Sequence, residues 1–226
     1  WSSDVCSSDL FINAIVLTMD EKLTQYDPGT VAVKGDSIVA VGAEAELKKE
    51  YSANEIIDCG GKILMPGLVN AHTHVPMTLV RGLADDLRLD VWLMGYMLPV
   101  EREFVSPEFV RLGTQIACAE QIRSGVTTFN DMYFFEDDIA QATADAGMRA
   151  VCGESVMKYP APDAPAFEDS IAYAREFIKK WKGHPLIVPA IAPHAPYSTT
   201  PEILRTCSNI AQEFDVPLHI HISETA

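Results

Sequence analysis

Two histidines separated by one residue form the first pattern in the sequence that could do chemistry. His72 and His74 end an apolar run at residues 68–71 that is typical of a strand. Because side chains alternate along a strand, both imidazoles would face the same side. Two neutral imidazole nitrogens on one face supply half of a zinc site. The pair alone is equally compatible with ordinary packing, so further ligands must come from elsewhere in the chain.

A second histidine pair ends a later apolar run. His219 and His221 lie in residues 217–222, and Glu224 follows His221 by three positions. His221 would point into the space that the first pair shares if the strands belong to one closing sheet. A carboxylate at Glu224 could then take a proton from a metal-activated water and pass it on. The plainer interpretations are a hydrogen-bonded interior histidine for His219, which we favour, and a helix N-terminal carboxylate for Glu224.

One further histidine stands in a stiff turn. His194 lies between Pro193 and Pro196, just after an apolar run at residues 186–192. Proline fixes the backbone on both sides, so the direction of this side chain is well defined. His194 could donate a hydrogen bond to a substrate, or it could be a hydrogen-bonded turn residue. His184, between a glycine and a proline, is expected in a surface loop without a role.

These histidines can meet only if the strands that carry them end at the same edge of one sheet. Strands are expected at residues 68–71, 126–130, 150–153, 186–192 and 217–222, and helices at residues 106–125, 136–146, 168–182 and 201–214. Alternating strands and helices with nearly all-apolar strands predict an α/β fold around a parallel sheet buried on both faces. The connection at residues 73–105 is longer than a simple strand–helix loop, and long loops usually carry function.

The first third of the chain has a different pattern. Strands are expected at residues 12–19, 30–33 and 38–41, followed by a short helix at residues 43–51. Met65-Pro66-Gly67 then breaks the pattern and predicts a domain junction. The polar residues 1–9 lack the features of a signal peptide and are interpreted as a non-native leader. The predicted domains are therefore the leader at 1–9, part of a β-sandwich at 10–65 and the α/β part at 66–226.

Composition excludes several functional classes. The 226 residues carry 17 basic and 32 acidic side chains, a formal net charge of −15. Such an acidic chain is a poor partner for nucleic acid or an anionic membrane. No apolar run approaches the ~18–20 residues that a membrane span needs. The five cysteines are scattered and form no CxxC pair, so a reducing cytoplasm is the expected location.

The runs around these residues resemble the amidohydrolase superfamily and, more narrowly, the 5-methylthioadenosine/S-adenosylhomocysteine deaminases. The most specific run is PGLVNAHTH at residues 66–74. Further matching runs follow in the expected order: Arg81-Gly82, Asp85-Asp86, Trp92-Leu93, Pro99-Val100-Glu101, GVTTF at 125–129, PHAPY at 193–197 and HISET at 221–225. The resemblance covers about residues 10–226.

The resemblance implies a fold, a cofactor and roles for particular residues. The implied fold is a (β/α)₈ TIM-type barrel, of which about five strands are present, preceded by part of a small β-sandwich. One Zn²⁺ per subunit is implied, because the fourth strand lacks the lysine that bridges two metals in dinuclear relatives. The implied roles are zinc ligation by His72, His74 and His221, proton transfer by Glu224, and substrate binding by Glu101, His194, Trp92 and Glu224.

The implied reaction is hydrolytic deamination of an adenosine analogue, 5′-methylthioadenosine or S-adenosylhomocysteine, to the inosine analogue and ammonia. Glu224 would protonate N1 of the purine, and Glu101 would accept hydrogen bonds from the ribose hydroxyls. Residues 157–167 show no arginine for a substrate carboxylate, which favours methylthioadenosine.

The resemblance also implies ligands that lie beyond residue 226. The family's fourth zinc ligand follows the eighth strand, and a further catalytic histidine follows the sixth. A full barrel takes ~250 residues, so the chain is expected to be the N-terminal part of a longer enzyme, inactive in isolation and open to homo-oligomer formation at full length. Two alternatives stay open: a related hydrolase of another ring, such as a triazine chlorohydrolase or a guanine- or cytosine-deaminase-like enzyme, and a metal-binding fragment without catalysis.

Overall fold

The computed structural model describes residues 8–224 and forms two compact units that divide between Gly67 and Leu68. The division falls at the Met65-Pro66-Gly67 segment, where the sequence predicts a junction. Within the described range, no helix is both long enough and apolar enough to cross a membrane.

The smaller unit is built on a mixed five-stranded sheet in the order β3-β2-β1-β4, with β5 also paired to β1. Its elements are β1 (Ser8–Leu17), β2 (Gln25–Lys34), β3 (Ser37–Ala43), α1 (Glu44–Glu50), β4 (Ala53–Asp58) and β5 (Ile63–Leu64). The β1–β2 and β2–β3 pairs are antiparallel, and β1 runs parallel to β4 and β5. Ala14, Val16 and Val31 form its buried apolar cluster.

The first strand of this unit begins within the predicted leader, at its last two residues. Ser8 and Asp9 belong to β1, where Asp9 pairs with Val33 and Ser8 with Ala53. The reason is that strand pairing continues past the point where the alternating apolar pattern stops. Residues 1–7 of the predicted leader lie outside the described residues.

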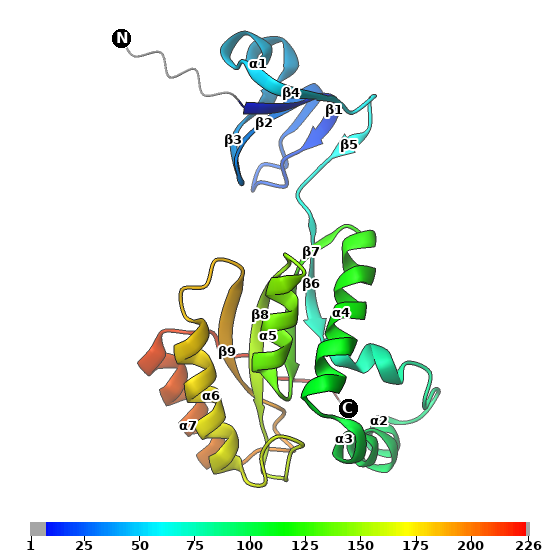
Figure 1. The fold of residues 1–226 in the computed structure, drawn as a ribbon, viewed down its shortest axis with the longest axis vertical. Coiled ribbons are helices and arrows are strands. Elements are labelled where there is room, and N and C mark those ends of the chain that lie inside the picture. Colours follow the sequence, from blue (N-terminus) through cyan, green and yellow to red (C-terminus); the bar gives the residue numbers. More distant parts are fainter. Residues whose placement is uncertain (1–7, 225–226) are drawn as a thin grey trace. The chain divides into compact units, whose positions relative to one another are not determined.

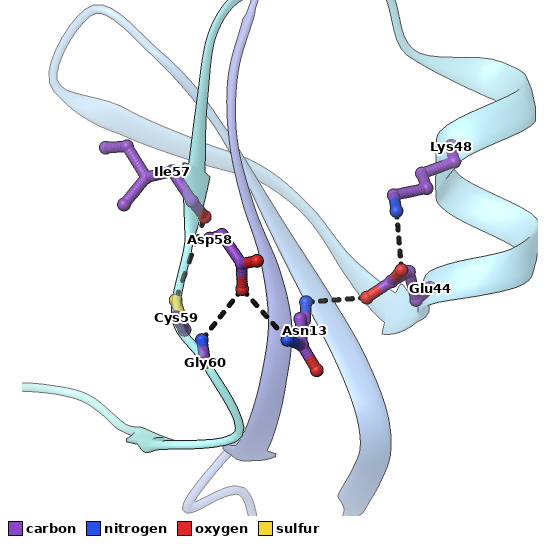
Figure 2. A network of polar contacts seen from close by, with 7 residues as sticks. All are labelled: Asn13, Glu44, Lys48, Ile57, Asp58, Cys59 and Gly60. Carbon is purple, nitrogen blue, oxygen red and sulfur yellow. Dashed lines mark hydrogen bonds and ion pairs between the residues drawn. The ribbon is translucent and has the colours of Figure 1, made fainter.

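A polar network joins strand β1 and the end of β4 to helix α1 (Figure 2). Asn13 interrupts the regular pairing of β1 with a positive φ of 53°. Its backbone N–H donates to Glu44 Oε2 at 2.5 Å, and its side-chain amide donates to Asp58 Oδ1 at 2.9 Å. Hydrogen bonding to Lys48 lowers the pKa of Glu44, and the backbone N–H of Gly60 lowers that of Asp58. The network thus fixes where α1 and the end of β4 meet β1.

The larger unit has a parallel sheet in the order β6-β7-β8-β9, with helices α4 to α7 lying against it (Figure 1). The strands are β6 (Leu68–Thr73), β7 (Val126–Tyr133), β8 (Arg149–Val156) and β9 (Ile187–Pro193). The helices are α4 (Pro107–Arg123), α5 (Glu136–Asp145), α6 (Phe167–Trp181) and α7 (Pro201–Phe214). One cluster of buried side chains, which includes Phe129, Ile139 and Ile178, fills the space between sheet and helices. This is the predicted α/β architecture.

Capping residues explain where two of these helices begin. Ser106 precedes α4, and its side chain accepts a hydrogen bond from the backbone N–H of Phe109 at 3.2 Å. Thr200 precedes α7 and accepts in the same way from Ile203 at 3.2 Å. Each helix has proline in its first turn, where no N–H partner is needed. These local signals let the start of both helices be predicted from the sequence.

The predicted fifth strand is wrong as a regular element. Leu218 makes one isolated parallel bridge to Ile191, and residues 217–222 otherwise have no strand assignment. Proline at 217 cannot donate to a sheet ladder, although its carbonyl accepts from the N–H of Ile191 at 3.1 Å. The sheet therefore has four regular strands, and the segment that carries His221 lies beside β9 without a full ladder.

The long connection after β6 is largely helical. It contains η1 (Val75–Val80), α2 (Leu89–Trp92), the π-helix η2 (Leu93–Met97) and α3 (Leu98–Phe104). A short π-helix contains one more residue in each hydrogen-bonded turn than an α-helix, and such segments are frequent at functional sites. Helices α2, η2 and α3 follow one another directly along the chain, and together they carry Trp92 and Glu101.

Helix α4 packs closely on η1 through a glycine. A Cβ on Gly113 would lie 2.6 Å from the carbonyl oxygen and 2.7 Å from the Cα of Pro76. We expect Gly113→Ala to lower the free energy of unfolding by about 1–3 kcal/mol, because backbone atoms must move to admit the methyl group. Chemical denaturation measures the change. Gly95→Ala is the control, since a Cβ added there would meet no neighbouring atom within 4 Å; an equal loss in both variants would contradict the proposed clash.

Candidate metal centre

The structure brings three of the predicted histidines together. His72 lies in β6, His74 directly follows β6, and His221 comes from the segment beside β9. One ring nitrogen from each lies within 4.8 Å of the other two. The ring centroids are 5.3 Å apart for His72–His74, 5.1 Å for His72–His221 and 5.2 Å for His74–His221. Three imidazoles from two distant parts of the chain therefore lie close together.

Backbone carbonyls define the protonation of two of these rings. The Nδ1 atom of His74 lies 2.6 Å from the carbonyl oxygen of Met132, and that of His221 lies 2.9 Å from the carbonyl oxygen of His194. Because a carbonyl oxygen only accepts, each Nδ1 carries a proton, which leaves Nε2 as the nitrogen available to a metal. Histidine ligands of metals are typically oriented in this way.

The spacing of His72 and His221 and the neutral state of His74 are compatible with binding of a zinc ion. Two nitrogens that bind one zinc ion at 2.0–2.1 Å lie about 3.3 Å apart, and the Nε2 atoms of His72 and His221 are 3.2 Å apart. Burial lowers the pKa of His74 to about 4, with smaller effects from the neighbouring histidines. His74 is therefore neutral at pH 7, as a metal ligand must be.

A cavity of about 260 Å³ opens over the three rings. Its lining includes every residue that the sequence analysis assigned to the site: His72, His74, Trp92, Glu101, His194, His221 and Glu224. Glu101 projects from α3 and is only 7% exposed. Burial raises the pKa of Glu101 to about 7, so a ligand that donates hydrogen bonds to its carboxylate would favour the ionised form.

His194 is a hydrogen-bonded turn residue, one of the two alternatives that the sequence left open, and its ring also reaches the cavity. Its Nδ1 atom lies 2.7 Å from Ser198 Oγ, so it is hydrogen bonded within the turn after β9. Its ring also lines the cavity, 5.0 Å from the ring of His221. Burial, followed by the nearby His221 and His74, lowers the pKa of His194 to about 4. The residue is thus a neutral imidazole at the wall of the cavity.

Glu224 has a partner that the sequence analysis missed. The hydroxyl of Tyr197 donates a hydrogen bond to Glu224 Oε2 at 2.9 Å. Burial, followed by the bond to Glu224, raises the pKa of Tyr197, so the phenol stays protonated and remains a donor. Tyr197 follows His194 in the same stiff turn, and its place after a strand end was the available signal.

His219 and His184 lie where the plainer interpretations expected them. His219 is partly buried, with Nε2 3.0 Å from the carbonyl oxygen of Asp131. His184 accepts hydrogen bonds from the backbone N–H groups of Leu186 and Ile187, both at 3.2 Å. Asp131 itself escaped the sequence analysis, although an acidic residue after the apolar run at 126–130 is unusual in a buried strand.

Comparisons with known proteins show which proteins the chain is similar to. The chain is 46% identical over 215 residues to a 5-methylthioadenosine/S-adenosylhomocysteine deaminase of Syntrophobacter fumaroxidans, covering 95% of this chain and 49% of that protein. It superimposes with a TM-score of 0.93 on the crystal structure of an adenosine deaminase from Xanthomonas campestris with bound zinc, at 38% identity, covering 97% of this chain and 50% of that one.

A triazine hydrolase of Arthobacter aurescens shares the fold, with a TM-score of 0.85 at 23% identity over 96% of this chain and 53% of that one. The chain spans about half the length of the curated relatives it matches. The sequence profile of the amidohydrolase family matches residues 63–226. Since that range is well over half of the chain, the protein belongs to the amidohydrolase family.

Proposed function

We propose that the chain carries the zinc site and part of the substrate pocket of a hydrolytic deaminase of adenosine analogues. The products are the inosine analogue and ammonia, and His72, His74 and His221 hold one zinc ion per subunit. The observation that carries the proposal is the meeting of these three rings with Glu101 and Glu224 in one cavity. The 46% identity to a 5-methylthioadenosine/S-adenosylhomocysteine deaminase supports the same reaction.

Glu224 performs the proton transfers in this proposal. Bound zinc supplies a Lewis acid that makes water nucleophilic at neutral pH. The carboxylate of Glu224 takes a proton from the attacking water and delivers it to N1 of the purine. The hydroxyl of Tyr197 donates a hydrogen bond to Oε2 of this carboxylate and so orients the side chain.

Glu101 and the walls of the cavity bind the substrate. The carboxylate of Glu101 accepts hydrogen bonds from the two ribose hydroxyls, while Trp92 and the neutral His194 contact the nucleoside. Four methionines also line the cavity: Met77, Met97, Met132 and Met157. Among the described residues no lysine or arginine lines it. Polarizable methionines without a basic partner for a carboxylate suit a methylthio group better than a charged amino-acid tail, which favours methylthioadenosine over S-adenosylhomocysteine.

The proposed partner is therefore a small nucleoside.

The four cysteines in residues 8–224 are all free thiols, Cys59, Cys118, Cys152 and Cys207. Free thiols support a reducing, cytoplasmic location for the enzyme.

Glu101→Gln tests the nucleoside specificity in the whole protein. We expect kcat/KM for methylthioadenosine to fall about 10- to 100-fold, because hydrogen bonds to a charged group are worth about 1.5–3 kcal/mol. Turnover of the free base, adenine, should change far less, since it has no ribose. The change in ultraviolet absorbance from adenine to hypoxanthine measures both reactions.

Glu103→Gln is the matched control for this experiment. Glu103 lies two residues further along α3 and is exposed, so the same chemical change should leave both reactions unaltered. Equal losses on nucleoside and base in the Glu101 variant would count against ribose binding and favour a hydrolase that acts on a bare ring.

A further inference from the structure

Asp131 lies at the end of β7 and is fully buried, with 0% exposure. Its Oδ1 atom accepts two hydrogen bonds, from the hydroxyl of Thr73 at 2.6 Å and from the backbone N–H of Val75 at 2.7 Å. Thr73 stands between the two histidines of the first pair, and Val75 follows the second. One carboxylate oxygen therefore ties down the backbone on both sides of His74.

The backbone of the same residue reaches the other histidine segment. The carbonyl oxygen of Asp131 is 3.0 Å from Nε2 of His219, which is two positions before His221. The next carbonyl, that of Met132, accepts from Nδ1 of His74. The end of β7 thus contacts both segments that bring histidines to the centre.

Glycine at position 153 makes room for this second contact. A Cβ on Gly153 of β8 would lie 2.4 Å from both Cε1 and Nε2 of His219. The His219 ring therefore fills a notch that only glycine leaves open. Residues 217–222 lack a regular ladder, so this side-chain anchor adds to the few backbone contacts that place them, namely the bridge at Leu218 and the N–H bonds of His219 and His221.

We propose that Asp131 is a positioning residue that holds the two histidine segments in register with each other, its carboxylate fixing the segment of His72 and His74 and its carbonyl fixing the segment of His221 through His219. The inference rests on the proposed zinc site, but it concerns residues that do not touch the ion. Two short hydrogen bonds to one fully buried oxygen are directional, and a donor left unpaired in the interior is costly. Loss of this oxygen frees the segment around His74, so bringing the three ring nitrogens to one point then costs free energy.

The test compares zinc affinity in Asp131→Ala and Asp131→Asn, measured in the whole protein by competition with a chromogenic chelator. Removing partners of the ligand segments typically weakens metal binding about 10- to 100-fold, and we expect this loss in the alanine variant. Asparagine keeps an oxygen that can accept both hydrogen bonds, so its zinc affinity should stay within about threefold of wild type.

Asp163→Ala is the matched control. Asp163 is also an aspartate that accepts a short backbone hydrogen bond, from Phe135 N–H at 2.6 Å, but it contacts neither histidine segment. It should lose stability without losing zinc affinity. If Asp131→Ala binds zinc as tightly as Asp163→Ala, or if asparagine fails to rescue, the inference is overturned.

Two milder variants keep the inference testable if Asp131→Ala does not fold. Thr73→Val removes one donor to the carboxylate without changing side-chain shape, and Gly153→Ala pushes on the His219 ring. Each should weaken zinc binding several-fold, and wild-type affinity in both would overturn the inference. A wild-type protein that binds no zinc would instead overturn the proposed function, and this inference with it.

Discussion

Replacing Glu224 by Gln is expected to lower kcat for methylthioadenosine by about 10²- to 10⁴-fold, the usual contribution of a general acid–base. The amide has nearly the same shape but cannot take a proton from water. Its oxygen can still accept the hydrogen bond from Tyr197, so the side chain should keep its place. Zinc content should be unchanged, because Glu224 is not part of the histidine cluster. Steady-state kinetics and metal analysis of the whole protein measure the two quantities.

Glu202→Gln controls for the loss of one negative charge. Glu202 is exposed in the first turn of α7, away from the residues that line the cavity, and its replacement should leave kcat unaltered. If Glu224→Gln retained wild-type kcat, the proton would have to move through another group, and the proposed role of Glu224 would be wrong.

His74→Ala is expected to remove bound zinc and, with it, deaminase activity. The variant leaves two ring nitrogens in place of three, and burial keeps His74 neutral and ready to bind in the wild type. Treatment of the wild type with a chelator should abolish activity in the same way. Added zinc should then restore the wild type and fail to restore the variant, as measured by metal content and turnover.

His184→Ala is the matched control for histidine removal. Its ring hydrogen bonds to the loop before β9 and takes no part in the cluster, so zinc content should match that of the wild type. A His74→Ala protein with full zinc content and activity would contradict the three-histidine centre.

Local sequence signals were sufficient for several elements and for the shared direction of His72 and His74, whereas the joining of His221 to this pair was expected from the family resemblance. Thr200 and Pro201 mark the start of α7, and the bounds expected at 201–214 are those observed. The His72–His74 pair could be recognised because a strand repeats its side-chain direction every two residues. Glu101 and Trp92 were reachable only through the family resemblance, since nothing in their local pattern distinguishes them from other helix residues.

Contacts between distant segments could not be predicted from local pattern. The apolar residues at 217–222 have the composition of a strand. Pairing, however, depends on how the backbone groups of β9 are placed, and only Leu218 forms a bridge. The bond from Tyr197 to Glu224 spans 27 positions, and the one from Thr73 to Asp131 spans 58. Such bonds depend on how strand ends meet, which periodicity does not encode.

In the irregular segment beside β9, metal binding should slow the hydrogen exchange of the backbone amides. Residues 217–222 are attached by the bridge at Leu218, by the N–H of His219 to Ile191 and by the N–H of His221 to His194. A segment with few ladder bonds opens at low free-energy cost and exchanges its amide protons quickly. An ion held by His221 binds only the closed form, and at 100 times its dissociation constant it adds about 2.7 kcal/mol to closure. Amide exchange in this short stretch should therefore slow by about a hundredfold on zinc binding. Bound metal would thus stabilise the closed segment, as a neighbouring strand does for a regular one.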